Sequence, residues 1–224
     1  RAARLHDLGK AHPQWQTKLR DHGRAGDPQP YDGPLMAKAP AMNYKAGRRY
    51  LRHELATALA LLAAPELLDD LDGPQQDLLL FLVASHHGKV RMVLRSLVDE
   101  ERPRDALRLE SADGQPGSPE SARYSQMGRH NGADRLYALG ILDGDKLPAA
   151  NLGDNVQTEP ITLSLDVMNL GEGPGGPSWT ERARALRDAD PIGPFRLAYY
   201  EALLRAADGR GSQLGTSRTE DNDD

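Results

Sequence analysis

The chain of 224 residues contains no cysteine, which excludes both a disulfide framework and cysteine-ligated zinc. Aromatic residues make up only 5% of it. The core must therefore be built mainly from Leu, Ala and Val, a composition that favours helices over a β-sandwich. No stretch approaches the roughly 18 consecutive apolar residues of a membrane span, and the first residues lack the apolar core of a signal peptide. We expect one mainly α-helical, cytoplasmic domain without a membrane partner.

The charge is distributed unevenly along the chain. Residues 1–60 carry 11 Lys and Arg against 5 Asp and Glu, whereas the whole chain has 28 against 33. A basic N-terminal part is suited to a polyanion, although the chain as a whole is acidic. A basic face that is merely solvated is the alternative interpretation, and the sequence leaves both open.

Hydrophobic periodicity predicts helices towards both ends of the chain and a short β-hairpin between them. Residues 161–167 alternate apolar and polar side chains, as in a strand, and residues 147–152 are the expected partner. The segment 99–130 is charged and rich in Gly, Pro and Ser, so we expect a loop there. The acidic segment 211–224 is predicted to be a disordered tail. The expected helices cover residues 1–11, 13–19, 50–68, 75–87, 90–98, 134–142, 179–187 and 194–207.

Histidine and aspartate stand at four places that together suggest one metal centre. Imidazole and carboxylate are the groups that hold Mn, Fe, Co, Ni or Zn, and two such ions a few Å apart can promote phosphodiester hydrolysis. The candidate ligands are His6, Asp7, His53, His86, His87 and Asp208.

Two of these places have informative neighbours. Lys10 follows Asp7 by about one turn and could face a phosphate. His86 and His87 end a strongly apolar predicted helix, where a polar pair needs partners. The remaining histidines, at 12, 22 and 130, stand in polar or loop contexts, so we do not assign them to the centre.

The segments that carry these residues, in this order, resemble the HD-domain phosphohydrolase superfamily. They are most similar to the HD nuclease domain of type I CRISPR interference. The resemblance covers residues 1–100 and 179–212, and it rests on four motifs: His6-Asp7-Leu8-Gly9-Lys10 with Trp15-Gln16, Arg52-His53-Glu54, Ser85-His86-His87-Gly88 and Ala207-Asp208.

The resemblance implies a helical HD bundle over residues 1–210, with residues 99–178 as a loop and hairpin insertion. In such a site Asp7 would bridge two metal ions. One ion would also be held by His53, His86 and His87, and the other by His6 and Asp208. The family uses a further upstream histidine, so we expect the domain to be truncated at its N-terminus.

By this resemblance the chain would be a nuclease that cleaves single-stranded DNA during interference, with Asp7 and Lys10 as its catalytic residues. Two divalent transition-metal ions are expected, with Mn, Fe, Co or Ni favoured over Mg. The expected partners are an interference helicase, fused or separate, and the RNA-guided surveillance complex. Six basic residues are predicted to guide the strand: Lys45, Arg48, Arg49, Arg52, Lys89 and Arg91.

Two other functions remain open at this point. The same ligands suit an HD phosphohydrolase acting on a small nucleotide, which would need a closed pocket for base and sugar. Alternatively, a catalytically incomplete domain could serve as a docking module of the CRISPR complex.

Overall fold

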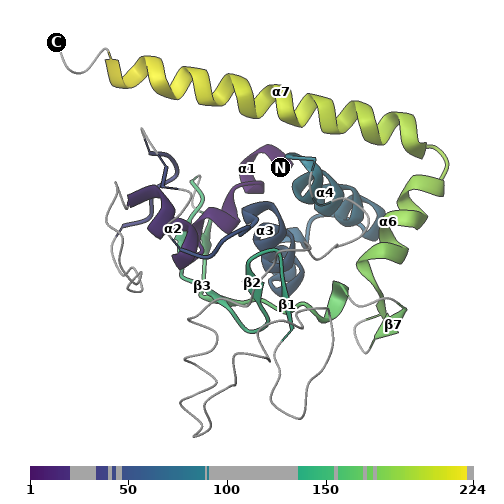
Figure 1. Ribbon diagram of the computed structural model, residues 1–224. Helices are drawn as coiled ribbons and strands as arrows, with labels where there is room; N and C mark the ends of the chain where they lie inside the picture. The colour runs from purple at the N-terminus through teal and green to yellow at the C-terminus, as the bar shows by residue number, and fades with distance from the viewer. Residues whose placement is uncertain are drawn as a thin grey trace, which may run out of the picture.

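The computed structural model describes residues 1–20, 34–39, 42–43, 47–88, 90, 136–153, 156–168, 171–173 and 176–220. The described chain is mainly α-helical, as predicted (Figure 1). Helices α3 (His53–Ala63) and α4 (Gly73–Ser85) pack against each other, and the 3-10 helix η1 (Leu8–Ala11) packs on α3. None of the described helices combines the length and the apolar character needed to cross a membrane.

The N-terminal segment is built from short helices. Helix α1 (Ala2–Leu5) and η1 are separated at His6 and Asp7, so the predicted continuous helix over residues 1–11 is interrupted. The interruption turns the chain at the two residues that were expected to bind metal. Helix α2 (Pro13–Arg20) follows directly and confirms the helix predicted at 13–19.

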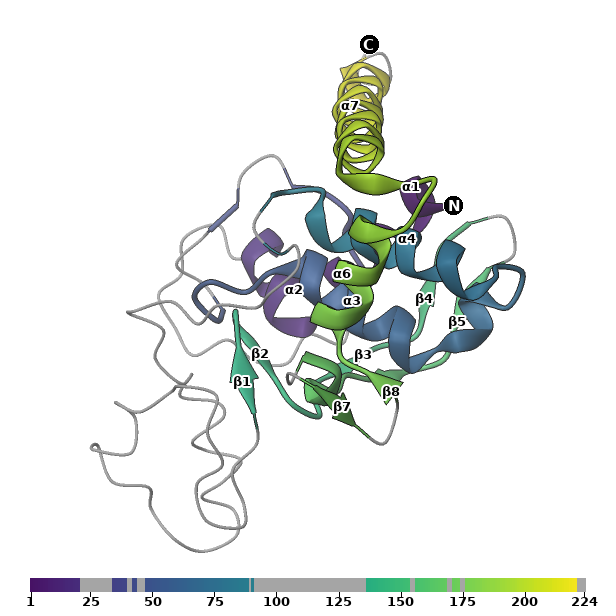
Figure 2. The ribbon, with the colours of Figure 1, turned by 90° about the vertical axis from the view of Figure 1, so that its right-hand side faces the viewer.

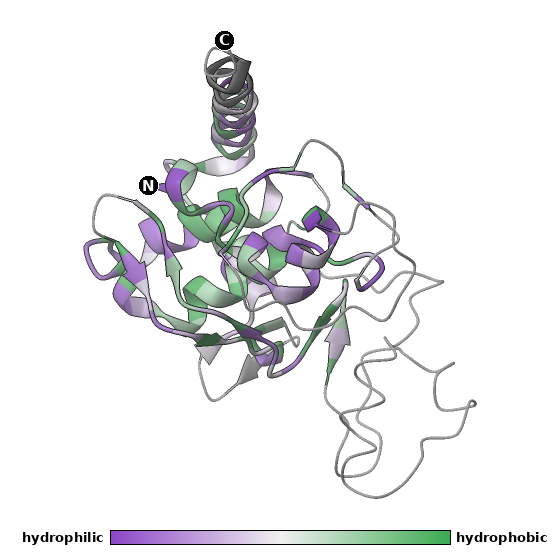
Figure 3. Cartoon of the chain, turned by 90° about the vertical axis from the view of Figure 1, so that its left-hand side faces the viewer, coloured by the Kyte–Doolittle hydropathy of each residue, from purple (hydrophilic) through white to green (hydrophobic). Residues whose placement is uncertain are grey.

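Helix α3 is the most completely buried of the described helices. Every residue from 53 to 61 is buried, whereas the first turns of α4 are exposed or half-buried. The helix predicted over 50–68 begins only at His53 and ends before Pro65, where the 3-10 helix η2 (Pro65–Leu68) follows. In Figure 3 the packed central helices carry much of the apolar colouring.

Helices α4 and α6 begin at capping boxes. Asp72 accepts a hydrogen bond from the Gln75 backbone, and the Gln75 side chain accepts one from Asp72. Ser178 and Glu181 form the same arrangement at α6 (Trp179–Asp188). Each pair satisfies backbone donors that a helix start leaves open, so the local sequence fixes both starting points.

The described residues between the helical parts form four two-stranded antiparallel ladders. Strand β3 (Lys146–Leu147) pairs with β6 (Ile161–Thr162), and β4 (Ala150–Asn151) pairs with β5 (Gln157–Thr158), which confirms the predicted hairpin. The ladder β7 (Glu172–Gly173) with β8 (Gly176–Pro177) was not predicted. Figure 2 shows these strands beside the helical body.

The helix predicted at 134–142 is wrong over its described part. There β1 (Tyr137–Ala138) and β2 (Ile141–Leu142) form a hairpin. The turn residues Leu139 and Gly140 have φ of 48° and 79°, the left-handed conformation that two-residue hairpin turns require. The apolar spacing suits a helix, but the turn brings Gly140 against the Leu51 backbone, where a Cβ would clash.

Helix α7 (Gly193–Glu220) is much longer than the helix predicted at 194–207. It runs across one end of the helical body (Figure 1) and packs on α4, α6 and α1. The tail predicted to be disordered from residue 211 is therefore helical as far as residue 220. Glycines at 209 and 211 led to that error, because glycine disfavours a helix by about 1 kcal/mol. The Lys38 ammonium donates to the Ser212 carbonyl in this part. Most of the predicted helix 90–98, the predicted loop 99–130 and residues 221–224 lie outside the described residues.

Candidate metal centre

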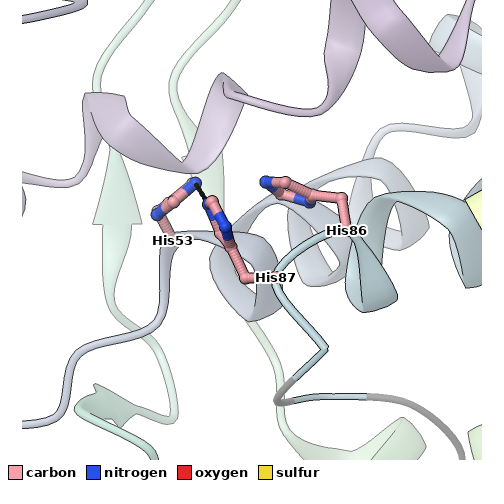
Figure 4. Close-up of side chains that lie close together, drawn as sticks. All are labelled: His53, His86 and His87. Atoms are coloured by element: carbon pink, nitrogen blue, oxygen red, sulfur yellow. Dashed lines mark hydrogen bonds between the residues drawn. The ribbon is translucent and has the colours of Figure 1, made fainter. Parts of the chain in front are cut away.

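Four histidine rings meet where α1, α3 and α4 converge. His86 lies 4.1 Å from His87, 5.4 Å from His53 and 5.0 Å from His6, measured between ring centroids. Figure 4 shows His53, His86 and His87 close together, with the Nε2 atoms of His53 and His87 3.2 Å apart. Side chains separated by more than 30 residues in sequence thus form one cluster.

Asp7 lies between two groups of possible ligands. Its Oδ1 is 3.3 Å from His53 Nε2, and its Oδ2 is 3.4 Å from His6 Nε2. One ligand atom from each of His53, His86 and His87 lies within 4.8 Å of the others, and the same holds for His6, Asp7 and His86. A carboxylate with its two oxygens directed to different groups is suited to bridging two metal ions.

Asp208 reaches the cluster from α7. Its Oδ1 lies 3.4 Å from His6 Nε2, although the two residues are 202 positions apart. The structure therefore brings together all six side chains that the sequence suggested as ligands. The sequence predicted Asp208 at the end of its helix, whereas the structure places it inside α7.

Hydrogen bonds to backbone carbonyls orient two of the rings. His6 Nδ1 is 2.9 Å from the Ala3 oxygen, and His86 Nδ1 is 2.6 Å from the Val83 oxygen. In both rings Nδ1 then carries the proton, and Nε2 keeps a lone pair directed into the cluster. Ligating histidines in metal sites are held in this way.

The buried Nε2 atom of His86 shows whether a metal ion suits the cluster. Its side chain is only 2% exposed, and its Nε2 has no hydrogen-bond partner among the described residues. A buried polar atom without a partner is costly. A divalent ion held by imidazole and carboxylate groups would satisfy this atom, so the residues present fit such a group.

The close approach of η1 to α3 sets the position of Asp7. A Cβ at Gly9 would lie 2.7 Å from the Thr57 backbone nitrogen and even closer to the His53 carbonyl oxygen. The Gly9 amide donates to Thr57 Oγ1 at 2.7 Å, and this hydroxyl lies 3.0 Å from the His6 oxygen. Thr57 thus links both ligand-bearing segments, a role that the sequence did not reveal because threonine within a helix is common.

The Gly9→Ala variant should destabilise the domain by about 1–3 kcal/mol, because the added methyl group overpacks a backbone contact. It should also weaken Mn²⁺ binding, since Asp7 would move away from His53. Urea unfolding and calorimetric titration measure the two effects. The control is Gly73→Ala, since a Cβ at Gly73 would meet nothing within 4 Å. Equal stability of the two variants would contradict the role of Gly9.

The electrostatics of the cluster favour neutral histidines beside a charged carboxylate. Burial lowers the pKa of His86 and of His87 to about 4. Burial would raise the pKa of Asp7, but the His53 hydrogen bond and the Lys10 charge outweigh it and hold that pKa well below its usual range. Near neutral pH the imidazoles of His86 and His87 can therefore accept a metal without first losing a proton.

The affinity for Mn²⁺ should change little between about pH 8 and pH 6 and fall as the pH approaches about 4. The sign follows from competition: a lowered histidine pKa means that protons displace the metal only in more acidic solution. Ordinary histidines would begin to lose the metal near pH 6.5. Equilibrium dialysis at a series of pH values measures this, and a tenfold loss between pH 7 and pH 6 would contradict it.

The Lys10 side chain is engaged in an ion pair. Its ammonium lies 2.7 Å from Asp7 Oδ2, so it pairs with the candidate bridging carboxylate. The sequence had suggested that it faces a phosphate. Trp15, from the same resemblance, packs its ring 4.5 Å from that of His53. Gln16 donates to the Lys10 carbonyl at 2.7 Å and exchanges two hydrogen bonds with Met36.

Arg48 is not placed to guide a strand. It is only 5% exposed and pairs with Asp145 through both terminal nitrogens, Nη1 and Nη2, of its guanidinium. His12 donates to the same carboxylate at 3.1 Å, and the Leu142 amide does so at 2.8 Å. His12, which the sequence had set aside as polar or loop-bound, is thus a buried structural residue. Neither role could be seen in the sequence, because Asp145 lies 97 residues after Arg48 and 133 residues after His12.

The other predicted strand-guiding residues fall into two classes. Arg49 is exposed and lies over the Tyr50 ring at 5.2 Å, and Arg52 is half-buried immediately before His53. Lys45, Lys89 and Arg91 lie outside the described residues. Of the described candidates, Arg52 is the nearest in sequence to a possible ligand.

Comparison with protein families identifies a match over more than half of the chain. Residues 2–130 match the family model described as the HD domain of Cas3, a range that includes five of the six candidate ligands but not Asp208. No curated protein and no solved structure matches the chain.

Proposed function

The chain belongs to the Cas3 HD-domain family, and from that membership we propose that it is a metal-dependent nuclease that cleaves single-stranded DNA in type I CRISPR interference. The proposal rests most on one observation. Six ligand-type side chains meet at one place, and the buried Nε2 of His86 has no partner among the described residues.

The family resemblance supplies the assignment of these ligands to two ions. His53, His86 and His87 with one oxygen of Asp7 would hold one ion, and His6 and Asp208 with the other oxygen would hold a second. Divalent ions so held would supply Lewis-acid activation of water and neutralise charge on the phosphate. Imidazole donors favour Mn, Fe, Co or Ni over Mg.

The protein's own groups prepare the site for this chemistry. The carbonyls of Ala3 and Val83 fix the tautomers of His6 and His86, so their Nε2 atoms need no rearrangement. The Trp15 ring covers one side of His53 and limits access of water there. Lys10 would place its positive charge beside a phosphate oxygen once the Asp7 oxygens are otherwise engaged.

Replacing Asp7 tests the proposal directly. The Asp7→Ala variant should lose cleavage of single-stranded DNA by on the order of 100-fold or more, because both ligand groups share this carboxylate. EDTA should abolish cleavage by the unaltered protein, and Mn²⁺ should restore it better than Mg²⁺. Gel assays with a labelled oligonucleotide measure these rates. The matched control is Asp166→Ala, which removes an exposed carboxylate outside the cluster. Cleavage by Asp7→Ala at the control's rate would refute the mechanism.

A second experiment separates the nuclease from the two other functions. With Mn²⁺ present, kcat/KM for single-stranded DNA should exceed that for mononucleotides by on the order of 100-fold, because remote phosphates add binding energy. Circular single-stranded DNA as substrate also reveals whether cuts are made internally. Comparable rates on mononucleotides would favour the small-nucleotide phosphohydrolase. Tight Mn²⁺ binding with no hydrolysis of either would favour the docking module.

A further inference from the structure

Lys18 on α2 is a largely buried cation without an acidic partner. The residue is only 4% exposed, and no carboxylate among the described residues forms an ion pair with it. Its Nζ is not among the fully buried unpartnered atoms, so the ammonium still reaches solvent while its aliphatic stem is covered. Burying a charge without a counter-ion is costly. Because the ammonium reaches solvent, an anion that approaches from there would offset this cost.

A second cation lies near Lys18. The Arg52 guanidinium acts on Lys18 with the same sign of charge, and after burial it is the main cause that lowers the Lys18 pKa to about 8. Arg52 is half-buried and has no acidic partner among the described residues either. Two neighbouring cations that repel each other form a site for an anion, since one anion would relieve both charges.

The two cations flank the candidate metal centre. Lys18 Nζ lies 5.6 Å from the centroid of the Trp15 ring, which itself lies 4.5 Å from that of His53, so the ammonium is within about 10 Å of His53. Arg52 directly precedes His53 at the start of α3. The contact with Trp15 holds the ammonium in place by a cation–π interaction.

We propose that Lys18 and Arg52 form a phosphate-binding subsite for a nucleic-acid strand, next to the phosphate at the metal centre. The subsite rests on the proposed nuclease function, because it positions the same strand. Arg52 offers two parallel N–H donors to phosphate oxygens, and Lys18 adds a point charge. A phosphate in this position neutralises both cations and fixes the register of the strand on the metals.

Binding without metal tests the subsite apart from cleavage. The probe is a fluorescent oligothymidylate of about 12 nucleotides, titrated by anisotropy in EDTA between about 50 and 200 mM salt. Lys18→Met and Arg52→Gln should each weaken binding and reduce the slope of log K against log salt by part of about 0.7, the contribution of one phosphate contact. The double variant should lose about 0.7 in slope, because both cations contact the same phosphate.

Two further measurements separate binding from structure. Lys18→Met keeps the apolar volume and removes an unpaired charge, so its urea midpoint should equal or exceed that of the unaltered protein. Lys146→Met removes an exposed lysine on β3 and should change neither the midpoint nor the salt slope. A large drop in the Lys18→Met midpoint, or an unaltered salt slope in Lys18→Met, would overturn the subsite.

The outcome also distinguishes the subsite from the nuclease function. If the slopes fall as expected but Mn²⁺ supports no cleavage of DNA, the anion subsite stands and the nuclease proposal fails. If DNA is cleaved but the Lys18 and Arg52 variants bind it unchanged, the nuclease stands and the subsite fails.

Discussion

The candidate centre depends on the contact between the backbones of η1 and α3. Gly9 allows it, because any larger residue would collide with the His53 carbonyl and the Thr57 amide. The contact places Asp7 beside the start of α3, where His53 stands as the first helical residue. Thr57 reinforces it through the Gly9 amide and the His6 carbonyl. Without this approach the carboxylate would not lie between the two groups of histidines.

The structure uses buried histidine in two different ways. His12 has both ring nitrogens engaged, one with Asp145 and the other with the Gln14 amide, so it completes a closed network with Arg48. His86 has one nitrogen engaged by a carbonyl and the other without a partner among the described residues. A histidine with hydrogen-bond partners at both ring nitrogens links segments of the fold. A histidine with one unpartnered ring nitrogen can use that nitrogen to bind a ligand. The hydrogen-bond partners, more than burial, separate a structural histidine from a candidate metal ligand.

The sequence allowed the candidate ligands to be proposed because their chemistry is local. A His-Asp pair, a His-His pair and an isolated histidine are each visible within a few residues, and so are the helices α2 and α6 that periodicity and capping define. The role of Arg48 was not predictable, since it depends on a carboxylate 97 residues further on. The same reason explains the missed hairpin at β1 and β2. Its apolar spacing suits a helix. The turn depends on distant residues, because Gly140 packs on Leu51 and the Leu139 carbonyl accepts from the Arg52 amide.

The two groups of candidate ligands are unequally pre-organised. His53 and His86 come from the ends of packed helices, and His53, His86 and His87 also contact one another as rings. Asp208 instead projects from a part of α7 in which residues 205–207 and 209–213 are exposed. Its Oδ1 lies 3.4 Å from His6 Nε2. Its position therefore depends on the packing of α7 against α4, α6 and α1. A small shift of that helix would move Asp208 while leaving the three histidines in place. The arrangement thus combines a rigid ligand group with one whose geometry depends on the docking of a distant helix.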